Sequence, residues 1–190
     1  DDDDREGRAR RHEHRRHRLF ADVSPVAREL LAQARDPPDF GALPRPNTHG
    51  DLKISNLLFA ADGTGLCLVD LDTVGRLPLP YELGDDLRSW CNPDGEDVRG
   101  AHVRPEIFDA AIDGYASAGR ALVSGPELDL LVPGLATICL ELSARFLADA
   151  LNESYFGWNS SKYGTRGEHN LVRGLGQWTL RASVLASAGH

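Results

Sequence analysis

Hydrophobic residues recur at helical spacing through the second half of the chain, and prolines stand where these segments begin. A stripe follows Pro105 and consists of Ile107, Phe108, Ala111, Ile112 and Tyr115. Pro126 opens a second helix, which we expect to run to about residue 151 and to bend at Pro133-Gly134. A last helix is expected over roughly residues 168–188. The second half is therefore predicted to be helical.

The first half mixes a short helix with a β-hairpin. Ser24-Pro25 has the pattern of an N-cap followed by proline at the first helical position, and the helix should end before Asp36. Residues 36–48 carry four prolines and predict an extended connector. Two short apolar runs, 57–59 and 66–69, flank turn-forming residues and predict a hairpin. The pattern favours an α+β fold that is mostly helical, with one hairpin among four or five helices.

Length and composition set limits on the class of protein. The 190 residues suit one domain, and 41% hydrophobic residues exclude a wholly disordered chain. No run of about 18 apolar residues occurs, so we expect no membrane-spanning helix. The three cysteines, Cys67, Cys91 and Cys139, form no CxxC pair, which favours reduced thiols in a cytoplasmic protein. The chain has no methionine, and we interpret it as part of a longer protein.

Charge divides the chain into a tail and a body. Residues 1–18 hold seven arginines, six acidic residues and three histidines, and we expect them to form a disordered charged tail. They lack the apolar segment of a signal peptide. The other 172 residues keep 14 basic and 23 acidic side chains, a net charge of −9. Such a body would repel phosphates, so we expect no nucleic-acid partner.

The residues with the clearest chemistry lie around the predicted hairpin. The segment His49-Gly50-Asp51-Leu52-Lys53-Ile54-Ser55-Asn56 enters its first strand, and Asp70 follows its second. A hairpin brings its outer ends together, so Asn56 and Asp70 should lie close to each other, with Asp51 folded over the same spot. Carboxylate and amide oxygens are the ligands that Mg²⁺ prefers. This arrangement is typical of phosphoryl transfer, in which a carboxylate accepts the proton of the attacking hydroxyl.

These motifs resemble a known family. HGDLKISN is similar to the catalytic loop of the kinase-like small-molecule phosphotransferases, the aminoglycoside phosphotransferase and choline kinase superfamily, and its Asp-x4-Asn spacing also matches protein kinases. LVDLDTVGRLPLPYELGDDLRSWCNP resembles the metal-binding strand and following helix of that family. ELSARFLADALNESYF and HNLVRGLGQWTLRASV resemble the terminal helices of N-acetylhexosamine 1-kinases. The order of the segments implies a kinase-like C-terminal lobe over residues 19–190.

The resemblance implies roles for the residues of the catalytic loop and for its cofactors. Asp51 resembles the carboxylate that orients and deprotonates the acceptor hydroxyl, and Lys53 resembles a lysine near the transferred phosphate of ATP. Asn56 and Asp70 resemble the two Mg²⁺ ligands and so help to hold the nucleotide. His49 is expected to support the loop backbone.

Residues outside the loop receive roles from the same resemblance. Asp85 resembles a helix aspartate that hydrogen-bonds the catalytic loop, although Asp85 and Asp86 could also be acids that favour a helix N-terminus. Arg145 and Tyr155 are candidate acceptor-site residues. The implied acceptor is a hexosamine, an aminoglycoside or another amino-alcohol. His169 is expected to be a helix-start residue without a ligand.

The residues before His49 depart from the family pattern. They offer a charged tail, one short helix and a proline-rich connector, with no Gly-rich loop after a strand, and Lys53 and Lys162 are the only lysines in the chain. We therefore expect the N-terminal lobe that grips ATP to be absent. A non-catalytic remnant and a sugar-binding module of the same fold stay open as alternatives.

A second class of enzyme shares part of the pattern. Asp70 and Asp72 also fit the DxDxV signature of haloacid-dehalogenase-like phosphatases, in which the first aspartate is a nucleophile. That fold needs several further βα units, and the chain after Asp72 offers no convincing strands. Asp72 would otherwise join the metal ligands or cap the next turn.

Overall fold

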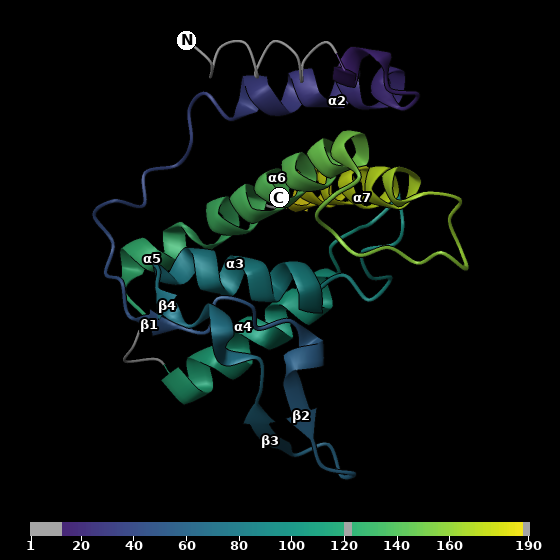
Figure 1. Cartoon of the computed structure of the whole chain (residues 1–190). Coiled ribbons are helices and arrows are strands. Elements are labelled where there is room, and N and C mark those ends of the chain that lie inside the picture. Colours follow the sequence, from purple (N-terminus) through teal and green to yellow (C-terminus); the bar gives the residue numbers. More distant parts are fainter. Residues whose placement is uncertain (1–12, 120–122, 188–190) are drawn as a thin grey trace.

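The computed structural model describes residues 13–119 and 123–187 (Figure 1). Its helices are α2 (Phe20–Gln33), α3 (Leu79–Trp90), α4 (Pro105–Gly119), α5 (Gly125–Asp129), α6 (Leu131–Asn152) and α7 (Arg166–Ser187). Its strands are β1 (Asn47–Thr48), β2 (Leu57–Phe59), β3 (Gly65–Leu68) and β4 (Gly75–Arg76). Two short 3₁₀ turns, η1 (Ile54–Asn56) and η2 (Leu71–Thr73), complete the order. The fold is α+β and mostly helical, as predicted.

The helix α6 lies at the centre of the helical frame. It packs side by side with α7, and α3 and α2 lie on different sides of this pair (Figure 1). One buried cluster joins α3, α4, α6 and α7 through residues that include Leu83, Leu135 and Leu180. A second cluster holds α2 on α6 and α7 through Leu30 and Leu171, among others. Burial of these apolar faces is the main force that fixes the helices.

Two glycines allow α3 and α6 to meet backbone to backbone. A Cβ atom built on Gly134 would lie 2.1 Å from the carbonyl oxygen of Pro80, and one on Gly84 would lie 2.9 Å from the carbonyl carbon of Gly134. The predicted helix does not break at Pro133-Gly134. The helical segment is interrupted at Leu130 instead, between α5 and α6, and Pro133 lies in the first turn of α6, where proline is tolerated.

Two antiparallel ladders bracket the segment that carries the predicted chemistry. The hairpin is confirmed: β2 pairs with β3, with Leu57 opposite Leu68. β1 pairs with β4, with Thr48 opposite Gly75. Residues 49–56 and 69–74 therefore run between the same two ladders, and each is anchored at both ends.

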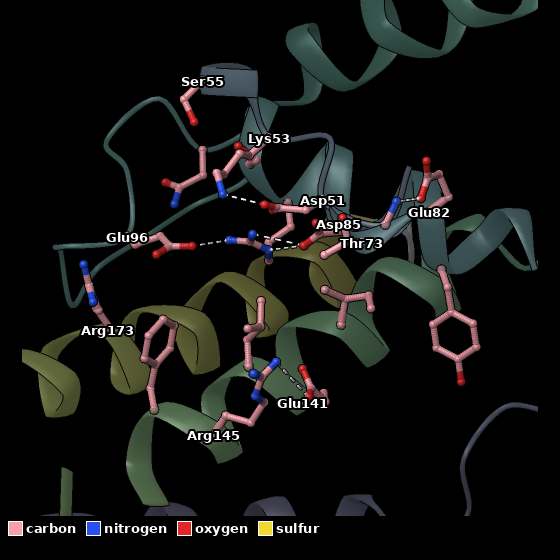
Figure 2. Close-up of a pocket in the computed structure, with 18 of the residues that line it drawn as sticks. Asp51, Lys53, Ser55, Thr73, Glu82, Asp85, Glu96, Glu141, Arg145 and Arg173 are labelled. Atoms are coloured by element: carbon pink, nitrogen blue, oxygen red, sulfur yellow. Dashed lines mark hydrogen bonds and ion pairs between the residues drawn. The ribbon is translucent and has the colours of Figure 1, made fainter. Parts of the chain in front are cut away.

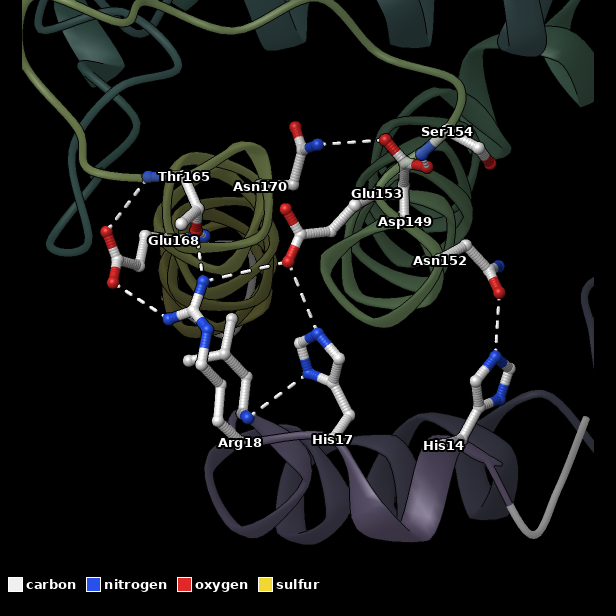
Figure 3. Close-up of polar contacts among 11 residues, drawn as sticks. His14, His17, Arg18, Asp149, Asn152, Glu153, Ser154, Thr165, Glu168 and Asn170 are labelled. Atoms are coloured by element: carbon white, nitrogen blue, oxygen red, sulfur yellow. Dashed lines mark hydrogen bonds and ion pairs between the residues drawn. The ribbon is translucent and has the colours of Figure 1, made fainter.

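The N-terminal part of the described chain is more ordered than its composition predicts. Residues 13–16 are helical, and α2 begins at Phe20 with Pro25 inside it rather than at its start. His14 Nε2 lies 2.7 Å from Asn152 Oδ1, and Arg18 donates to Glu168 Oε1 at 2.8 Å (Figure 3). The predicted disorder is thus wrong for residues 13–18, because acidic and amide groups of α6 and α7 bind them. Residues 1–12 lie outside the described part.

The three cysteines are free, as expected, and burial raises the pKa of Cys91 to about 11.

By length and hydropathy alone, α6 meets the criteria for a membrane-spanning helix, which the sequence prediction overlooked. In the structure its apolar residues pack against α3, α7 and α2, and a buried core helix meets the same criteria.

The contact between α3 and α6 gives a test of the fold. Substitution Gly134→Ala is expected to lower the free energy of unfolding by about 1–3 kcal/mol, because the new methyl group meets backbone that cannot rotate away. Gly114→Ala, in α4, is the matched control. A Cβ there has open space, so the change should stabilise the helix by about 0.5–1 kcal/mol. Urea denaturation measures both values, and equal effects of the two substitutions would contradict the close contact.

Candidate active site

The loop after β1 turns sharply at Gly50 and is held there by a buried carboxylate. Gly50 has φ of +82°, and a Cβ atom on it would lie 2.6 Å from the carbonyl oxygen of Thr73, so the turn requires glycine. Glu82 of α3 accepts the backbone N–H of His49 at 2.6 Å and that of Gly50 at 2.8 Å. Thr73 donates its hydroxyl to the carbonyl of His49 at 2.8 Å. The turn that carries Asp51 is thus fixed from two sides.

The same helix supports the rest of the loop. The Trp90 indole donates to the carbonyl of Leu52 at 2.9 Å, and the backbone N–H of Ile54 lies 3.4 Å from Ser89 Oγ. The resemblance predicted this supporting role for Asp85, and that prediction is wrong. Glu82 lies almost one helical turn earlier, where it reaches the loop, whereas Asp85 Oδ1 accepts hydrogen bonds from Arg88.

Asp51, Lys53 and Asn56 meet inside the loop. Lys53 donates its ammonium to Asp51 Oδ2, and this bond raises the pKa of Lys53 against the opposing effect of its partial burial. Asn56 is buried and donates its amide nitrogen to the carbonyl of Asp51 at 2.8 Å and to Asp51 Oδ2 at 3.2 Å. The Asp51 carboxylate is therefore held at Oδ2 by a cation and by an amide.

The hairpin brings Asp70 to the other side of this cluster. Val69 donates its backbone N–H to the carbonyl of Asn56 at 3.0 Å, and His49 Nε2 lies 3.0 Å from the carbonyl of Val69. Asp70 follows in the left-handed conformation, with φ of +67°, and its charge helps to raise the pKa of Lys53. The structure thus brings together Asn56 and Asp70, as the hairpin predicts. Asp72 is exposed within η2.

The donor set of this cluster suits a hard metal ion. Both donor contacts of the Asn56 amide nitrogen go to Asp51, which turns the amide oxygen away from Asp51 and leaves it free as a ligand. With the Asp70 carboxylate it gives two protein oxygens, as expected for Mg²⁺ that also binds phosphates and water. Within residues 13–119 and 123–187, no three His, Cys, Asp or Glu side chains form a metal-binding group.

A cavity of about 780 Å³ opens beside the loop (Figure 2). Asp51 and Lys53 line one wall, and Arg145 and Arg173, from α6 and α7, line the opposite wall with Phe156. The structure therefore brings the predicted acceptor residue Arg145 and Asp51 to one cavity. Tyr155 approaches Arg145, with its hydroxyl 3.4 Å from the guanidinium, but it is 71% exposed and does not line the cavity.

Comparison with known families agrees with this geometry. The sequence model of the phosphotransferase enzyme family, APH, matches residues 1–119, which include the loop, the hairpin, α3 and α4. The chain belongs to this family. Its members are kinase-type enzymes that act on small molecules, and they generally use ATP and Mg²⁺.

The phosphatase alternative finds no support in this phosphotransferase. In the described part of the chain, the two-residue β4 is the single strand after Asp72, and helices follow it. The repeated βα units of a haloacid-dehalogenase-like fold are thus missing from these residues. Asp70 is placed by the hairpin beside Asn56 rather than at the edge of a parallel sheet.

An ion cluster that the sequence did not reveal lines the same cavity. Arg88 is only 5% exposed; it donates through Nε to Asp85 Oδ1 at 3.0 Å and through Nη1 to Glu96 Oε1 at 2.7 Å. Burial opposes its charge, but the two carboxylates outweigh burial and raise the pKa of Arg88. The spacing of Asp85 and Arg88, three residues apart on one helix face, could have predicted their ion pair from the sequence. Glu96 carries no such signal, because it lies in a loop.

A buried histidine anchors the loop that holds Glu96. His169 is 1% exposed; its Nε2 lies 2.6 Å from Asp97 Oδ1, and its Nδ1 accepts the backbone N–H of Asn159 at 3.1 Å. Although burial raises the pKa of Asp97, its bonds to His169 and Arg173 lower it below the usual range. His169 lies in the first turn of α7, as predicted, and it positions the loop rather than any ligand.

A buried acid beside the loop gives a test by pH. Asp86 is 3% exposed, and its Oδ1 has no hydrogen-bond partner among the described residues. Burial, with the nearby charges of Glu82 and Asp85, raises its pKa to about 9. The folded protein therefore keeps this proton up to about pH 9, whereas the unfolded chain releases it near pH 4, so wild-type stability falls across that interval.

The variant Asp86→Asn cannot lose that proton. Relative to wild type, its free energy of unfolding should rise by up to about 1.4 kcal/mol per pH unit between pH 5 and 8, and level off above pH 9. Denaturation at several pH values measures the difference. Asp113→Asn, at an exposed position of α4, should give a curve parallel to wild type. A parallel curve for Asp86→Asn as well would contradict a neutral Asp86.

Proposed function

We propose that the protein is an ATP-dependent phosphotransferase that moves the γ-phosphate to a hydroxyl group of a sugar, an aminoglycoside or an amino-alcohol. The supporting observation is the position of Asp51. Its carboxylate lines a cavity of about 780 Å³, a volume suited to a small molecule, and the loop that carries it is fixed to α3. The family indicates the type of reaction, and the position of Asp51 supports this cavity as the proposed place of reaction.

Asp51 acts as the base in the proposed reaction. The acceptor hydroxyl donates its hydrogen bond to the Asp51 carboxylate, which orients the oxygen and takes its proton as the oxygen bonds to the γ-phosphorus. The bond between that phosphorus and the bridging oxygen of ADP breaks. Lys53, which bonds Asp51 in the structure, lies within reach to stabilise the negative charge of the transferred group.

Asn56 and Asp70 would hold Mg²⁺, through the amide oxygen and the carboxylate. The ion neutralises the charge of the nucleotide phosphates when it is bound. The contacts of Asn56 with Asp51 keep the amide in a single orientation, and the hairpin keeps Asp70 beside it. His49 supports both segments, because its ring meets the carbonyl of Val69.

The hairpin offers a surface for the part of the enzyme that grips the nucleotide. Its apolar side chains are open: Leu66 is 65% exposed, and Phe59 and Leu68 are also exposed. Several large apolar side chains exposed on one hairpin are typical of an interface. We propose that a nucleotide-binding lobe covers them in the active enzyme, and that residues 19–190 form the catalytic and acceptor lobe.

The acceptor is proposed to be a hexosamine first, on the resemblance of the terminal helices to N-acetylhexosamine 1-kinases. The aromatic pair Phe146 and Phe156, with ring centroids 4.4 Å apart, lines the wall opposite Asp51 and could stack on a sugar ring. Arg145 lies over both Phe156 and Tyr155 at this wall. Tyr155 is accordingly proposed to act on the acceptor through Arg145.

Substitution Asp51→Asn tests the catalytic assignment. In the complete protein, which includes the lobe that grips ATP, it preserves the size of the side chain but removes the base, so the rate of phosphate transfer from ATP should fall by about a hundredfold or more. The melting temperature should stay near that of wild type. Transfer of radiolabelled phosphate to a panel of sugars measures the rate, with Asp113→Asn as the matched control. An Asp51→Asn variant with the wild-type rate would refute the assignment.

Calorimetric titration with ATP and Mg²⁺ separates this function from the alternatives. Micromolar binding by the chain would exclude a remnant that cannot hold nucleotide. Sugar binding without any ATP binding would instead favour a sugar-binding module of the same fold. Removal of Mg²⁺ by a chelator should weaken ATP binding if Asn56 and Asp70 hold the ion.

A further inference from the structure

The ion cluster of Asp85, Arg88 and Glu96 faces a cavity, whereas a purely structural salt bridge needs no such position. Asp85, Arg88 and Glu96 all line the cavity that Asp51 lines (Figure 2). Asp85 comes from α3 and Glu96 from the loop that follows it, and Figure 2 shows them on opposite sides of the guanidinium to which both bond. The buried Arg88 thus holds two carboxylates at a fixed separation.

Each carboxylate uses one oxygen to bind Arg88. The bonds go to Asp85 Oδ1 and to Glu96 Oε1. Asp85 Oδ2 and Glu96 Oε2 form no hydrogen bond with any residue of the described ranges. A carboxylate has about four lone-pair sites, so each of these oxygens can accept further hydrogen bonds.

Asn92 holds the loop that carries Glu96. It is buried, and its amide nitrogen donates to the carbonyl of Gly95, the residue before Glu96, at 2.8 Å. This side of the cavity therefore presents two oxygen acceptors, one on Asp85 and one on Glu96, and calls for a ligand that donates hydrogen bonds.

The charges of the cavity are nearly balanced. Asp51 is bonded by Lys53, Asp85 and Glu96 share Arg88, and Glu141 lies 3.5 Å from Arg145. Glu82 binds backbone N–H groups, and Arg173 binds Asp97. The lining thus holds five carboxylates, each with a partner, and four cationic side chains. Because this charge is nearly balanced, it gives a cationic ligand little advantage over a neutral sugar whose hydroxyls can bond the carboxylate oxygens.

We propose that Asp85 and Glu96, held apart by Arg88, bind two neighbouring hydroxyl groups of a neutral sugar and so determine which acceptor is phosphorylated. This inference rests on the proposed function for the identity of the cavity as the acceptor site. Charge-assisted hydrogen bonds from hydroxyls to carboxylates give geometric selection as well as affinity. A sugar that lacks one of these hydroxyls leaves a carboxylate oxygen unpaired at the contact.

Calorimetric titration of the chain without nucleotide tests the assignment. The probes are methyl glycosides of glucose, galactose and N-acetylglucosamine, with analogues that lack one ring hydroxyl each. Removal of either of two adjacent hydroxyls should weaken binding about tenfold, whereas removal of the others should have a smaller effect. In the variant Glu96→Gln, the intact sugar should bind about tenfold more weakly, and one of the two deletions should lose its effect.

One control and one further test variant keep the result specific. Glu106→Gln makes the same chemical change at an exposed residue that is paired with Arg104 outside the cavity, and it should bind sugars like wild type. Asp85→Asn is the second test variant, in case Glu96→Gln fails to fold, and it should remove the effect of the other deletion. Thermal unfolding establishes that each variant is folded.

Several outcomes overturn the proposal. These are the absence of binding by every sugar of the panel, equal binding by wild type and Glu96→Gln, and tighter binding of a polyamine such as kanamycin than of the neutral sugars. The proposed function is tested separately by phosphate transfer. A protein that transfers phosphate but ignores the hydroxyl deletions refutes the role of Asp85 and Glu96 alone. A protein that binds as expected but transfers no phosphate refutes only the enzymatic activity.

Discussion

The hydrogen bonds of Glu82 are the constraint on which the active site depends. The turn at Gly50 directs two successive backbone N–H groups, those of His49 and Gly50, at α3. Unpaired buried N–H groups are costly, and a single carboxylate satisfies both. Because Glu82 belongs to α3, the compensation also ties the catalytic loop to the helical frame. This contact also sets the position of Asp51, which lies one residue after the turn.

The helix α3 also sets the distance across the cavity. The glycines Gly84 and Gly134 let α3 and α6 approach until their backbones touch, which brings Arg145 and Phe146 of α6 to the wall opposite Asp51. One face of α3 thus holds the loop while a neighbouring face holds the acceptor wall. A rigid element between the two suits phosphate transfer, since the reacting groups must be held in place for an in-line reaction.

The N-terminal segment shows why composition misled the prediction for part of the tail. His14, His17 and Arg18 are polar, yet each meets an acidic or amide partner near the end of α6 or the start of α7. Leu19 and Val23 add a buried anchor directly after them. A charged stretch fails to form a core by itself, but it can be held on a complementary surface that lies more than a hundred residues away in the sequence.

The sequence by itself determined the local features: the hairpin, the helices after Pro105, and the Asp51, Asn56 and Asp70 spacing that a hairpin must bring together. These depend on periodicity and turn chemistry within a few residues of one another. The tertiary structure alone decided which acid supports the loop, Glu82 rather than Asp85, and placed Arg88 between Asp85 and Glu96. The physical reason is that such contacts depend on how closely α3 approaches the loop and α6, and that distance is set by packing between segments far apart in the sequence.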